Sequence, residues 1–399
     1  MIWKIIENEL TWLEGFQFDF IPENLNSKIK IVKKGSLLGI TADGVIGSIA
    51  LSNGDTLQIS PKVGAFNFFR MLLTCEELYS DIIADYISLV NFTSTDLQSP
   101  TRLIIPSFVK SLKYLTKQGL LSDRIKVKTK GSFAQGEIEL LKTSLNIHRK
   151  KYDEIYYSTR KREYDTPENR ILSTAAKLVL NQYPNDLNSA DLSFIKNWAK
   201  RATGKAPQKN DLAEVNTKIL RKRHQGSRGY YINALILAKI LLTGVGFAQG
   251  DYEEIQAGNF LINSSSLFEE YLRKVLIKGL VNKGYFALKG GNPPEFLYTD
   301  TSFKLSPDIT LYKGTNPALI ADAKYKIPDA KDHYQIISYI QSYRVENGVI
   351  FFPIYDKGNH SITVKSTNKG LKVYLISLPL MDLDLTEEIV LENIIKILN

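Results

Sequence analysis

Two aspartates and a lysine, Asp308, Asp322 and Lys324, are the residues of this chain whose types and spacing could do chemistry. Apolar and polar residues alternate from Phe303 to Leu311, which predicts a strand with Asp308 on its polar face, and Asp322 and Lys324 share one face of a second strand. A hairpin centred on Thr315 would set the two aspartates opposite each other, about 4.5–5.5 Å apart at Cβ, where two carboxylates repel. This pairing predicts a hard divalent cation between them, Mg²⁺ first and Mn²⁺ as a substitute.

Such a site suits hydrolysis of a phosphodiester. That reaction needs a metal to neutralise the phosphate and acidify an attacking water, together with a group that orients the water or offsets developing charge. Asp308 and Asp322 would hold the cation, the backbone carbonyl of Ala323 could add a ligand, and the ammonium of Lys324 would lie beside water and phosphate. A Pro-Asp followed by D-x-K is common by chance, so the prediction depends on the predicted strands and their flanking helices.

Two neighbouring helices could complete the site. On the helix before the hairpin, Glu269 borders the apolar stripe and could bind metal, whereas Glu270 should point further into solvent. The alternative is that Glu269 closes an S-x-x-E capping box with Ser266. On the helix after the hairpin, Gln335 and Tyr339 share a face and could position the phosphate or the water. The alternative for this pair is a solvated glutamine and a core tyrosine.

The composition restricts the class of protein. The chain has 399 residues and a net charge of +9, which favours several domains and a polyanionic partner. Its single cysteine excludes an internal disulfide and a cysteine-rich zinc site, and suits the cytoplasm. The first residues do not resemble a signal peptide, and no apolar run is long enough for a membrane span. Without a GxxxxGK[ST] motif, we expect no nucleotide bound by this chain alone.

Three regions follow one another, so we expect an α/β multidomain protein. Residues 1–100 predict a small β domain, because the turn signals Asp43-Gly44 and Asn53-Gly54 separate strand-like runs that fit two linked hairpins. Residues 101–262 are mostly helical, with a helix start at Thr166-Pro167. Residues 263–399 predict a mixed sheet flanked by helices. The helices expected in the middle region span 166–183, 190–202, 211–222 and 230–242.

Basic residues of the middle region are candidates for contact with DNA phosphates. Lys126 and Lys128 lie on one face of a strand-like insertion, residues 124–143, and Arg221, Arg223 and Arg228 lie in or next to a glycine-containing loop. Lysines on a solvated edge strand and charge runs near helix ends also occur without any ligand, and this alternative stays open.

Pro307-Asp308 and Asp322-Ala323-Lys324 resemble the two motif halves of the PD-(D/E)xK nuclease superfamily. The wider chain resembles the McrC family, the endonuclease subunits of McrBC-type modification-dependent restriction systems. The segments that carry this resemblance are 37–40, 57–63 and 69–72 near the N-terminus, 131–138 and 166–172 in the middle, and 267–269 before the hairpin.

The resemblance implies a partner and a substrate. McrB, an AAA+ GTPase that assembles as a hexamer, would recognise DNA with modified cytosine, while the N-terminal region of this chain inserts into the ring and stimulates hydrolysis. The chain itself would then cleave double-stranded DNA with Mg²⁺. Two alternatives remain: a regulatory subunit that activates an NTPase without using its nuclease, and a stand-alone DNA-repair nuclease.

Overall fold

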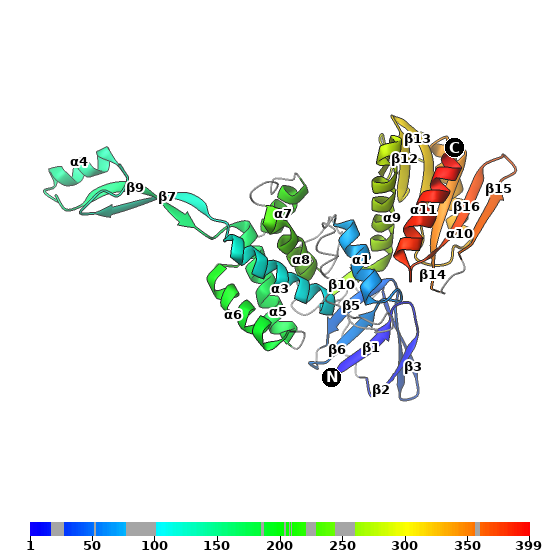
Figure 1. The fold of residues 1–399 in the computed structure, drawn as a ribbon, viewed down its shortest axis with the longest axis horizontal. Helices are drawn as coiled ribbons and strands as arrows, with labels where there is room; N and C mark the ends of the chain where they lie inside the picture. Colours follow the sequence, from blue (N-terminus) through cyan, green and yellow to red (C-terminus); the bar gives the residue numbers. More distant parts are fainter. Residues whose placement is uncertain are drawn as a thin grey trace. The chain divides into compact units, whose positions relative to one another are not determined.

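A computed structural model describes residues 1–16, 28–51, 53–76, 101–184, 187–202, 205–206, 208, 210–220, 229–243, 260–355 and 360–399 (Figure 1). These residues form two compact units. Unit 1 comprises Met1–Ile104 and Thr243–Asn399, and unit 2 comprises Ile105–Leu242. The N-terminal and C-terminal regions, which the sequence predicts as domains 1–100 and 263–399, therefore lie in the same unit.

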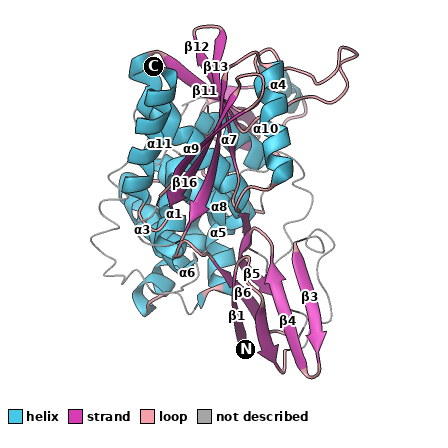
Figure 2. Ribbon diagram, turned by 90° about the vertical axis from the view of Figure 1, so that its right-hand side faces the viewer, coloured by secondary structure: helices cyan, strands magenta, loops and turns pink. Residues whose placement is uncertain are grey.

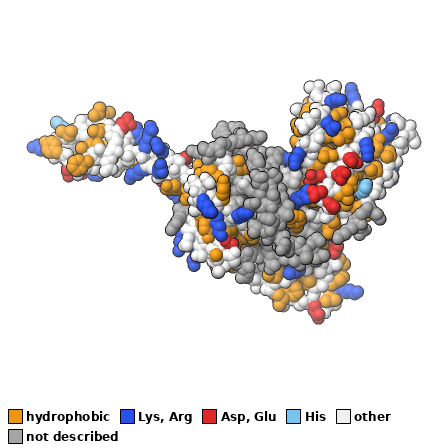
Figure 3. Space-filling model, in the orientation of Figure 1, with side chains coloured by type: hydrophobic (Ala, Val, Ile, Leu, Met, Phe, Trp, Pro, Cys, Tyr) orange, Lys and Arg blue, Asp and Glu red, His pale blue; other side chains and the backbone are white. Residues whose placement is uncertain are grey.

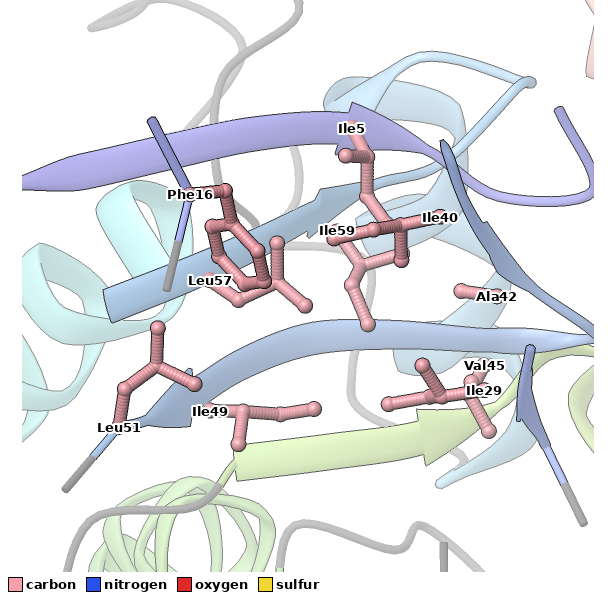
Figure 4. Close-up of a cluster of buried hydrophobic side chains, with 10 residues drawn as sticks. All are labelled: Ile5, Phe16, Ile29, Ile40, Ala42, Val45, Ile49, Leu51, Leu57 and Ile59. Atoms are coloured by element: carbon pink, nitrogen blue, oxygen red, sulfur yellow. The ribbon is translucent and has the colours of Figure 1, made fainter. Parts of the chain in front are cut away.

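The N-terminal β module, residues 1–60, contains two small sheets. Strands β2 (Thr11–Glu14), β4 (Leu37–Ala42) and β3 (Ile29–Lys34) form one, in the order β2-β4-β3. Strands β1 (Ile2–Ile6), β6 (Thr56–Ser60), β5 (Val45–Ala50) and β10 (Phe260–Asn263) form the other, in the order β1-β6-β5-β10. Buried aliphatic residues from both sheets, among them Ile40, Leu57 and Ile59, fill the core between them (Figure 4).

The two expected hairpins are present, but one turn signal has a different role. The hairpins are β3–β4 and β5–β6, and Asn53-Gly54 closes the second. Asp43-Gly44 instead carries the chain from β4 in one sheet to β5 in the other. Gly44 has a φ of 62°, so a tight left-handed turn is made here without pairing the flanking strands. Strand β10 was not expected in this module, because it comes from a distant part of the chain.

Helix α1 (Ala65–Cys75) connects the β module to the C-terminal part of unit 1. It packs against α9 (Ser264–Leu280). The side-chain amide of Asn67 donates hydrogen bonds to the carbonyls of Leu380 and Met381, at 3.1 and 3.0 Å. The continuation of this helix that the sequence predicts towards residue 87 lies outside the described residues.

The C-terminal body, residues 264–399, is built on a mixed six-stranded sheet of order β11-β12-β13-β14-β16-β15. Helices α9 and α11 (Leu383–Leu398) cover one face, and α10 (Ala330–Ser342) covers the other (Figure 2). The 3-10 turn η4 (Val281–Lys283) follows α9. The strands are β11 (Tyr285–Leu288), β12 (Ile309–Lys313), β13 (Asn316–Ala323), β14 (Asn347–Ile354), β15 (Ile362–Ser366) and β16 (Lys372–Pro379).

The first arm of the central hairpin is shorter than the sequence predicts. Strand β12 begins at Ile309, and Phe303 lies outside it with a φ of 55° and an exposed fraction of 73%. Pro307 has no N–H to donate to a neighbouring strand, so the paired segment begins only after this residue. Within β12 both faces are buried, Thr310 included, because helices cover both sides of the sheet. Simple alternation of polar and apolar residues therefore does not describe this strand.

Unit 2 combines helices with a small sheet. Helix α5 begins after Thr166, whose hydroxyl accepts a hydrogen bond from the N–H of Asn169, as the sequence predicts. Strands β7 (Asp123–Gly131), β9 (Ile155–Glu163) and β8 (Glu137–Ile138) pair in the order β7-β9-β8, with α4 (Leu140–His148) against β9. The helices are α3 (Thr101–Gln118), α5 (Pro167–Gln182), α6 (Ser189–Ala202), α7 (Asp211–Leu220), η3 (Gly229–Tyr231) and α8 (Ile232–Thr243).

No helix among the described residues is both long and apolar enough to cross a bilayer.

Candidate active site

The hairpin register places Asp308 beside Asp322. Ile309 pairs with Ala321, and extending this register by one residue opposes the two aspartates. The turn at Gly314-Thr315 pairs Lys313 with Asn316, which on its own would set Asp308 against Ala321. A bulge between Leu311/Tyr312 and the facing strand shifts the register by one residue. The bulge therefore decides that the two carboxylates meet.

The two carboxylates, called here the acidic pair, are buried together. Asp322 is 1% exposed, and Asp308 accepts a hydrogen bond at 3.0 Å from the N–H of Ala323. Burial, followed by the charges of Asp322 and Glu269, raises the pKa of Asp308 to about 8. Burial, reinforced by repulsion from the neighbouring carboxylates, therefore favours a proton on Asp308 at neutral pH.

Lys324 lies directly beside the acidic pair. Its Nζ is 2.6 Å from Oδ2 of Asp322 and donates a hydrogen bond at 2.9 Å to Oε1 of Gln335. This short contact is an ion pair between the ammonium and the buried carboxylate. Burial lowers the pKa of Lys324, but Asp322, Asp308 and Asp332 outweigh it and the net pKa is raised. Lys324 is therefore a cation at neutral pH and not a general base.

Helix α10 supports the lysine through the two residues that the sequence singled out. Nε2 of Gln335 donates to the hydroxyl of Tyr339 at 2.9 Å, and that hydroxyl reaches the carbonyl of Ser306 at 3.5 Å. The Tyr339 ring belongs to a buried apolar cluster, so this residue is both core and hydrogen-bond partner. Gln335 is not simply solvated, because it holds Lys324. Burial raises the pKa of Tyr339, which keeps its phenol neutral.

Asp332, at the start of α10, is a site neighbour that the sequence reasoning missed. Asp329 caps this helix in a capping box with Asp332. The carboxylate of Asp332 also lies 3.7 Å from Nζ of Lys324 and 3.3 Å from Nζ of Lys326. The D-x-x-D spacing before an apolar run is the sequence signal that could have identified it.

Glu269 lies near the acidic pair but does not join it. Asn263 caps α9 by accepting a hydrogen bond from the N–H of Ser266, so the capping box between Ser266 and Glu269 is wrong. The carboxylate of Glu269 is 3.0 Å from Nζ of Lys289. It still contributes to the raised pKa of Asp308. Its role as a metal ligand stays a prediction.

The expectation for Glu270 is also wrong. Its side chain is 15% exposed, against 19% for Glu269, because it forms an ion pair with Arg273. Arg273 in turn donates a hydrogen bond at 3.2 Å to the carbonyl of Asp308. This arginine is a second residue that sequence reasoning missed. No local pattern marks it, because its partner lies 35 residues away.

The acidic pair fits a magnesium ion. Among the described residues no three His, Cys, Asp or Glu side chains converge on one point, so the side-chain donors are the two aspartates. Mg²⁺ commonly takes one or two carboxylates and completes its shell with waters and substrate phosphates. The buried Oδ2 of Asp322, whose contact is the ammonium of Lys324 at 2.6 Å, would have to exchange that contact for the cation in order to act as a ligand.

Two of the candidate DNA contacts lie in the described part of unit 2. Lys126 and Lys128 are exposed on β7, and each forms an ion pair with a glutamate, Glu137 and Glu139 respectively. This pairing competes with phosphate binding, so contact with DNA stays a prediction for both lysines. Arg221, Arg223 and Arg228 lie outside the described residues.

Comparisons with known proteins identify the family. The family model described as McrBC 5-methylcytosine restriction system component matches residues 40–355. A chain of the refined half-complex from the tetradecameric assembly of Thermococcus gammatolerans McrB AAA+ hexamers with bound McrC has the same fold, with a TM-score of 0.69 and 16% identity over 100% of both chains. A chain of the Thermococcus gammatolerans McrBC complex matches 70% of this chain and 88% of its own length, with a TM-score of 0.50 and 15% identity. No curated protein sequence matches. Because the family model spans well over half of the sequence, this chain belongs to the McrBC 5-methylcytosine restriction system component family, in which it resembles McrC.

Proposed function

We propose that this chain is the endonuclease subunit of a McrBC-type restriction system and that it hydrolyses DNA phosphodiesters with Mg²⁺, or Mn²⁺ as a substitute. The observation that carries the proposal is the buried acidic pair of Asp308 and Asp322 with the charged Lys324 at 2.6 Å. This arrangement on a mixed sheet flanked by helices supports a PD-(D/E)xK site. Membership of a restriction-system family supports DNA as the substrate in this proposal.

Each side chain has a task in this proposal. Asp308 and Asp322 would hold the metal, with the Ala323 carbonyl as a further ligand. When bound, Mg²⁺ would neutralise charge on the scissile phosphate and acidify the attacking water. Lys324, kept charged and held by Gln335, would orient the water or stabilise the charge that develops on the phosphate.

The neighbouring residues would act on these groups. Tyr339 holds Gln335 in place, so that the amide oxygen faces Lys324. Arg273 holds the backbone of Asp308. Glu269 would increase the negative potential at the metal position and could reach the metal if it exchanged its contact with Lys289.

The partner in this proposal is an AAA+ GTPase of the McrB type, assembled as a hexamer and reading DNA with modified cytosine in the cytoplasm. The related McrC chain is bound to McrB AAA+ hexamers, which supports the same arrangement for this chain. The N-terminal β domain, residues 1–100, would insert into the ring and stimulate GTP hydrolysis.

Substitution of the site tests the chemistry. Asp308→Ala and Lys324→Ala, each assembled with the AAA+ partner, should cleave methylated plasmid DNA at least about 10²–10³-fold more slowly than the wild type, because each removes a metal ligand or a charge at the transition state. Asp300→Ala and Lys313→Ala, at exposed positions of the same body, serve as controls and should cleave normally. GTP hydrolysis should be stimulated equally by all four variants.

The alternatives give different results. Normal cleavage by Asp308→Ala or Lys324→Ala would show that the site is wrong. A wild-type chain that stimulates GTP hydrolysis without any cleavage would be an adaptor, and one that cleaves without partner or GTP would be a stand-alone repair nuclease.

A further inference from the structure

Glu7 is a fully buried acid outside the acidic pair. It follows β1 in the N-terminal β module and is 0% exposed. Its Oε1 accepts hydrogen bonds from the N–H of Lys62 at 3.0 Å and the hydroxyl of Tyr325 at 2.9 Å, and its Oε2 accepts one from the hydroxyl of Ser264 at 2.6 Å. Burying a carboxylate is costly unless donors compensate it, and three donors offset part of that cost here.

Tyr325 connects Glu7 with the lysine of the site. Tyr325 directly follows Lys324 in the sequence. The hydrogen bond from its hydroxyl to Glu7 therefore restrains the backbone next to Lys324. The N–H of Lys324 donates to the carbonyl of Phe351 at 2.8 Å, which restrains the other side. The Tyr325 ring also packs on Phe268, with ring centroids 5.6 Å apart, and Phe268 precedes Glu269.

Ser264 connects Glu7 with the helix behind the acidic pair. It is the first residue of α9, and its N–H donates to the carbonyl of Gly44 at 3.0 Å. Strand β10, directly before α9, pairs with β5 of the N-terminal β module. The same helix carries Glu269 and Arg273, and Arg273 contacts the backbone of Asp308. The carboxylate of Glu7 therefore holds two of the segments that lie beside the acidic pair, the Lys324–Tyr325 segment and the start of α9.

We propose that Glu7 is a positioning residue for the nuclease site, through which the N-terminal β module holds the Lys324–Tyr325 segment and the start of α9. The inference rests on the proposed function, because it assigns Lys324 a place in the reaction. It makes the N-terminal β module a structural part of the catalytic site as well as the proposed partner-binding region. A misplacement of about 1 Å in a reacting group can slow an enzyme roughly 10²-fold, so a remote hydrogen bond can matter for rate.

Removal of one hydroxyl tests the proposal. Tyr325→Phe should lower the single-turnover cleavage rate, at saturating Mg²⁺ and DNA, about tenfold or more, since Lys324 loses its restraint. The matched control is Tyr271→Phe, because the hydroxyl of the buried Tyr271 donates to Glu387 at 3.2 Å and, within the described part of the chain, not to Asp308, Asp322 or Lys324. Both variants should show similar unfolding midpoints and similar stimulation of GTP hydrolysis. Equal cleavage by the two variants would overturn the proposal.

A double-mutant cycle tests whether Glu7 acts through Tyr325. Glu7→Gln keeps the size of the side chain and replaces one acceptor oxygen. If the two residues act together, Glu7→Gln/Tyr325→Phe should cleave within about twofold of the slower single variant. Rate losses that multiply would mean independent effects and would overturn the coupling.

Hydrogen exchange separates this inference from the proposed function and covers the case in which Glu7→Gln does not fold. In the full chain, amides 323–327 should exchange faster in Tyr325→Phe than in Tyr271→Phe. Unchanged exchange overturns the positioning role. If the wild type cleaves no DNA under any condition, the proposed function fails. Faster exchange in both Tyr325→Phe and Glu7→Gln would still establish that the hydrogen bond between Glu7 and Tyr325 positions this segment.

Discussion

At the scale of single residues, the acidic pair stores electrostatic repulsion that a cation would relieve. Burial and the facing carboxylate raise the pKa of Asp308 from 3.8 to about 8. Between these two values the folded protein binds a proton that the unfolded chain does not. The stability contributed by this group is therefore complete below about pH 4 and is lost as the pH rises through about 8.

Asp308→Asn should consequently stabilise the metal-free protein at pH 8, by a few degrees in the unfolding midpoint, and give little gain at pH 4–5. The amide cannot ionise, so the repulsion with Asp322 disappears. Thermal unfolding from pH 5 to 9 in the presence of a chelator measures this effect. The pKa of the buried Glu7 is also raised, but it contributes equally to both proteins and cancels in their difference.

Added Mg²⁺ provides the control for this prediction. It should raise the midpoint of the wild type at pH 8 and leave that of Asp308→Asn almost unchanged, because binding to the folded state alone stabilises it. If the unfolding midpoints of the two proteins changed with pH in parallel, ionisation of Asp308 would not be the source of the destabilisation at high pH.

At the scale of elements, the close packing of α10 on the sheet depends on Gly348 in β14. A Cβ at this position would lie 2.5 Å from Cδ1 of Ile340 and 3.0 Å from Cγ1 of Ile336, both on α10. Helix α10, which carries Gln335 to Lys324, can therefore lie this close to β14 only because position 348 has no side chain.

Gly348→Ala should displace α10, destabilise the protein by about 1–3 kcal/mol and lower the cleavage rate, since Gln335 moves with the helix. Gly131→Ala is the matched control, because its added Cβ would meet Tyr157 only at an ordinary contact distance of 3.6 Å. Denaturant unfolding and single-turnover cleavage measure the two effects. A loss of stability with a normal cleavage rate would mean that the position of Gln335 does not depend on the close packing of α10 at Gly348.

At the scale of the whole molecule, unit 1 contains the acidic pair and the N-terminal β module, while unit 2 contains the arm, residues 123–163. Large apolar side chains remain exposed on the arm, including Leu140 at 77% and Leu141 at 84%, and hydrophobic side chains are visible over this segment in Figure 3. On the β module Val32 is 52% exposed. Exposed apolar surface of this kind is typical of protein contact sites, so the arm is a second candidate for contact with the AAA+ partner.

Leu141→Asp should weaken co-elution with the partner and its stimulation of GTP hydrolysis about tenfold or more, because a charge would be buried in the contact. Ser144→Asp, on the same short helix, controls for the added charge and should behave as the wild type. Val32→Asp tests the β module in the same assay. Full stimulation by Leu141→Asp with loss by Val32→Asp would place the contact on residues 1–100 alone.

The sequence by itself determined the features that depend on local periodicity and turn chemistry. A period of two places Asp322 and Lys324 on one face, and a spacing of four places Gln335 and Tyr339 together, whatever the rest of the chain does. The Thr166 cap and the pairing of the hairpin arms follow from neighbours close in sequence. These features were enough to propose a nuclease site.

Only the tertiary structure decided which distant groups meet. The bulge that opposes Asp308 to Asp322 lies in a sheet covered by helices on both faces, and the contact of Glu269 with Lys289 depends on how α9 lies over β11. The hydrogen bond between Glu7 and Tyr325 joins residues 318 positions apart. No local pattern carries such a contact, because it forms when separate elements bury their surfaces against one another, and this packing joins the N-terminal β module to the acidic pair.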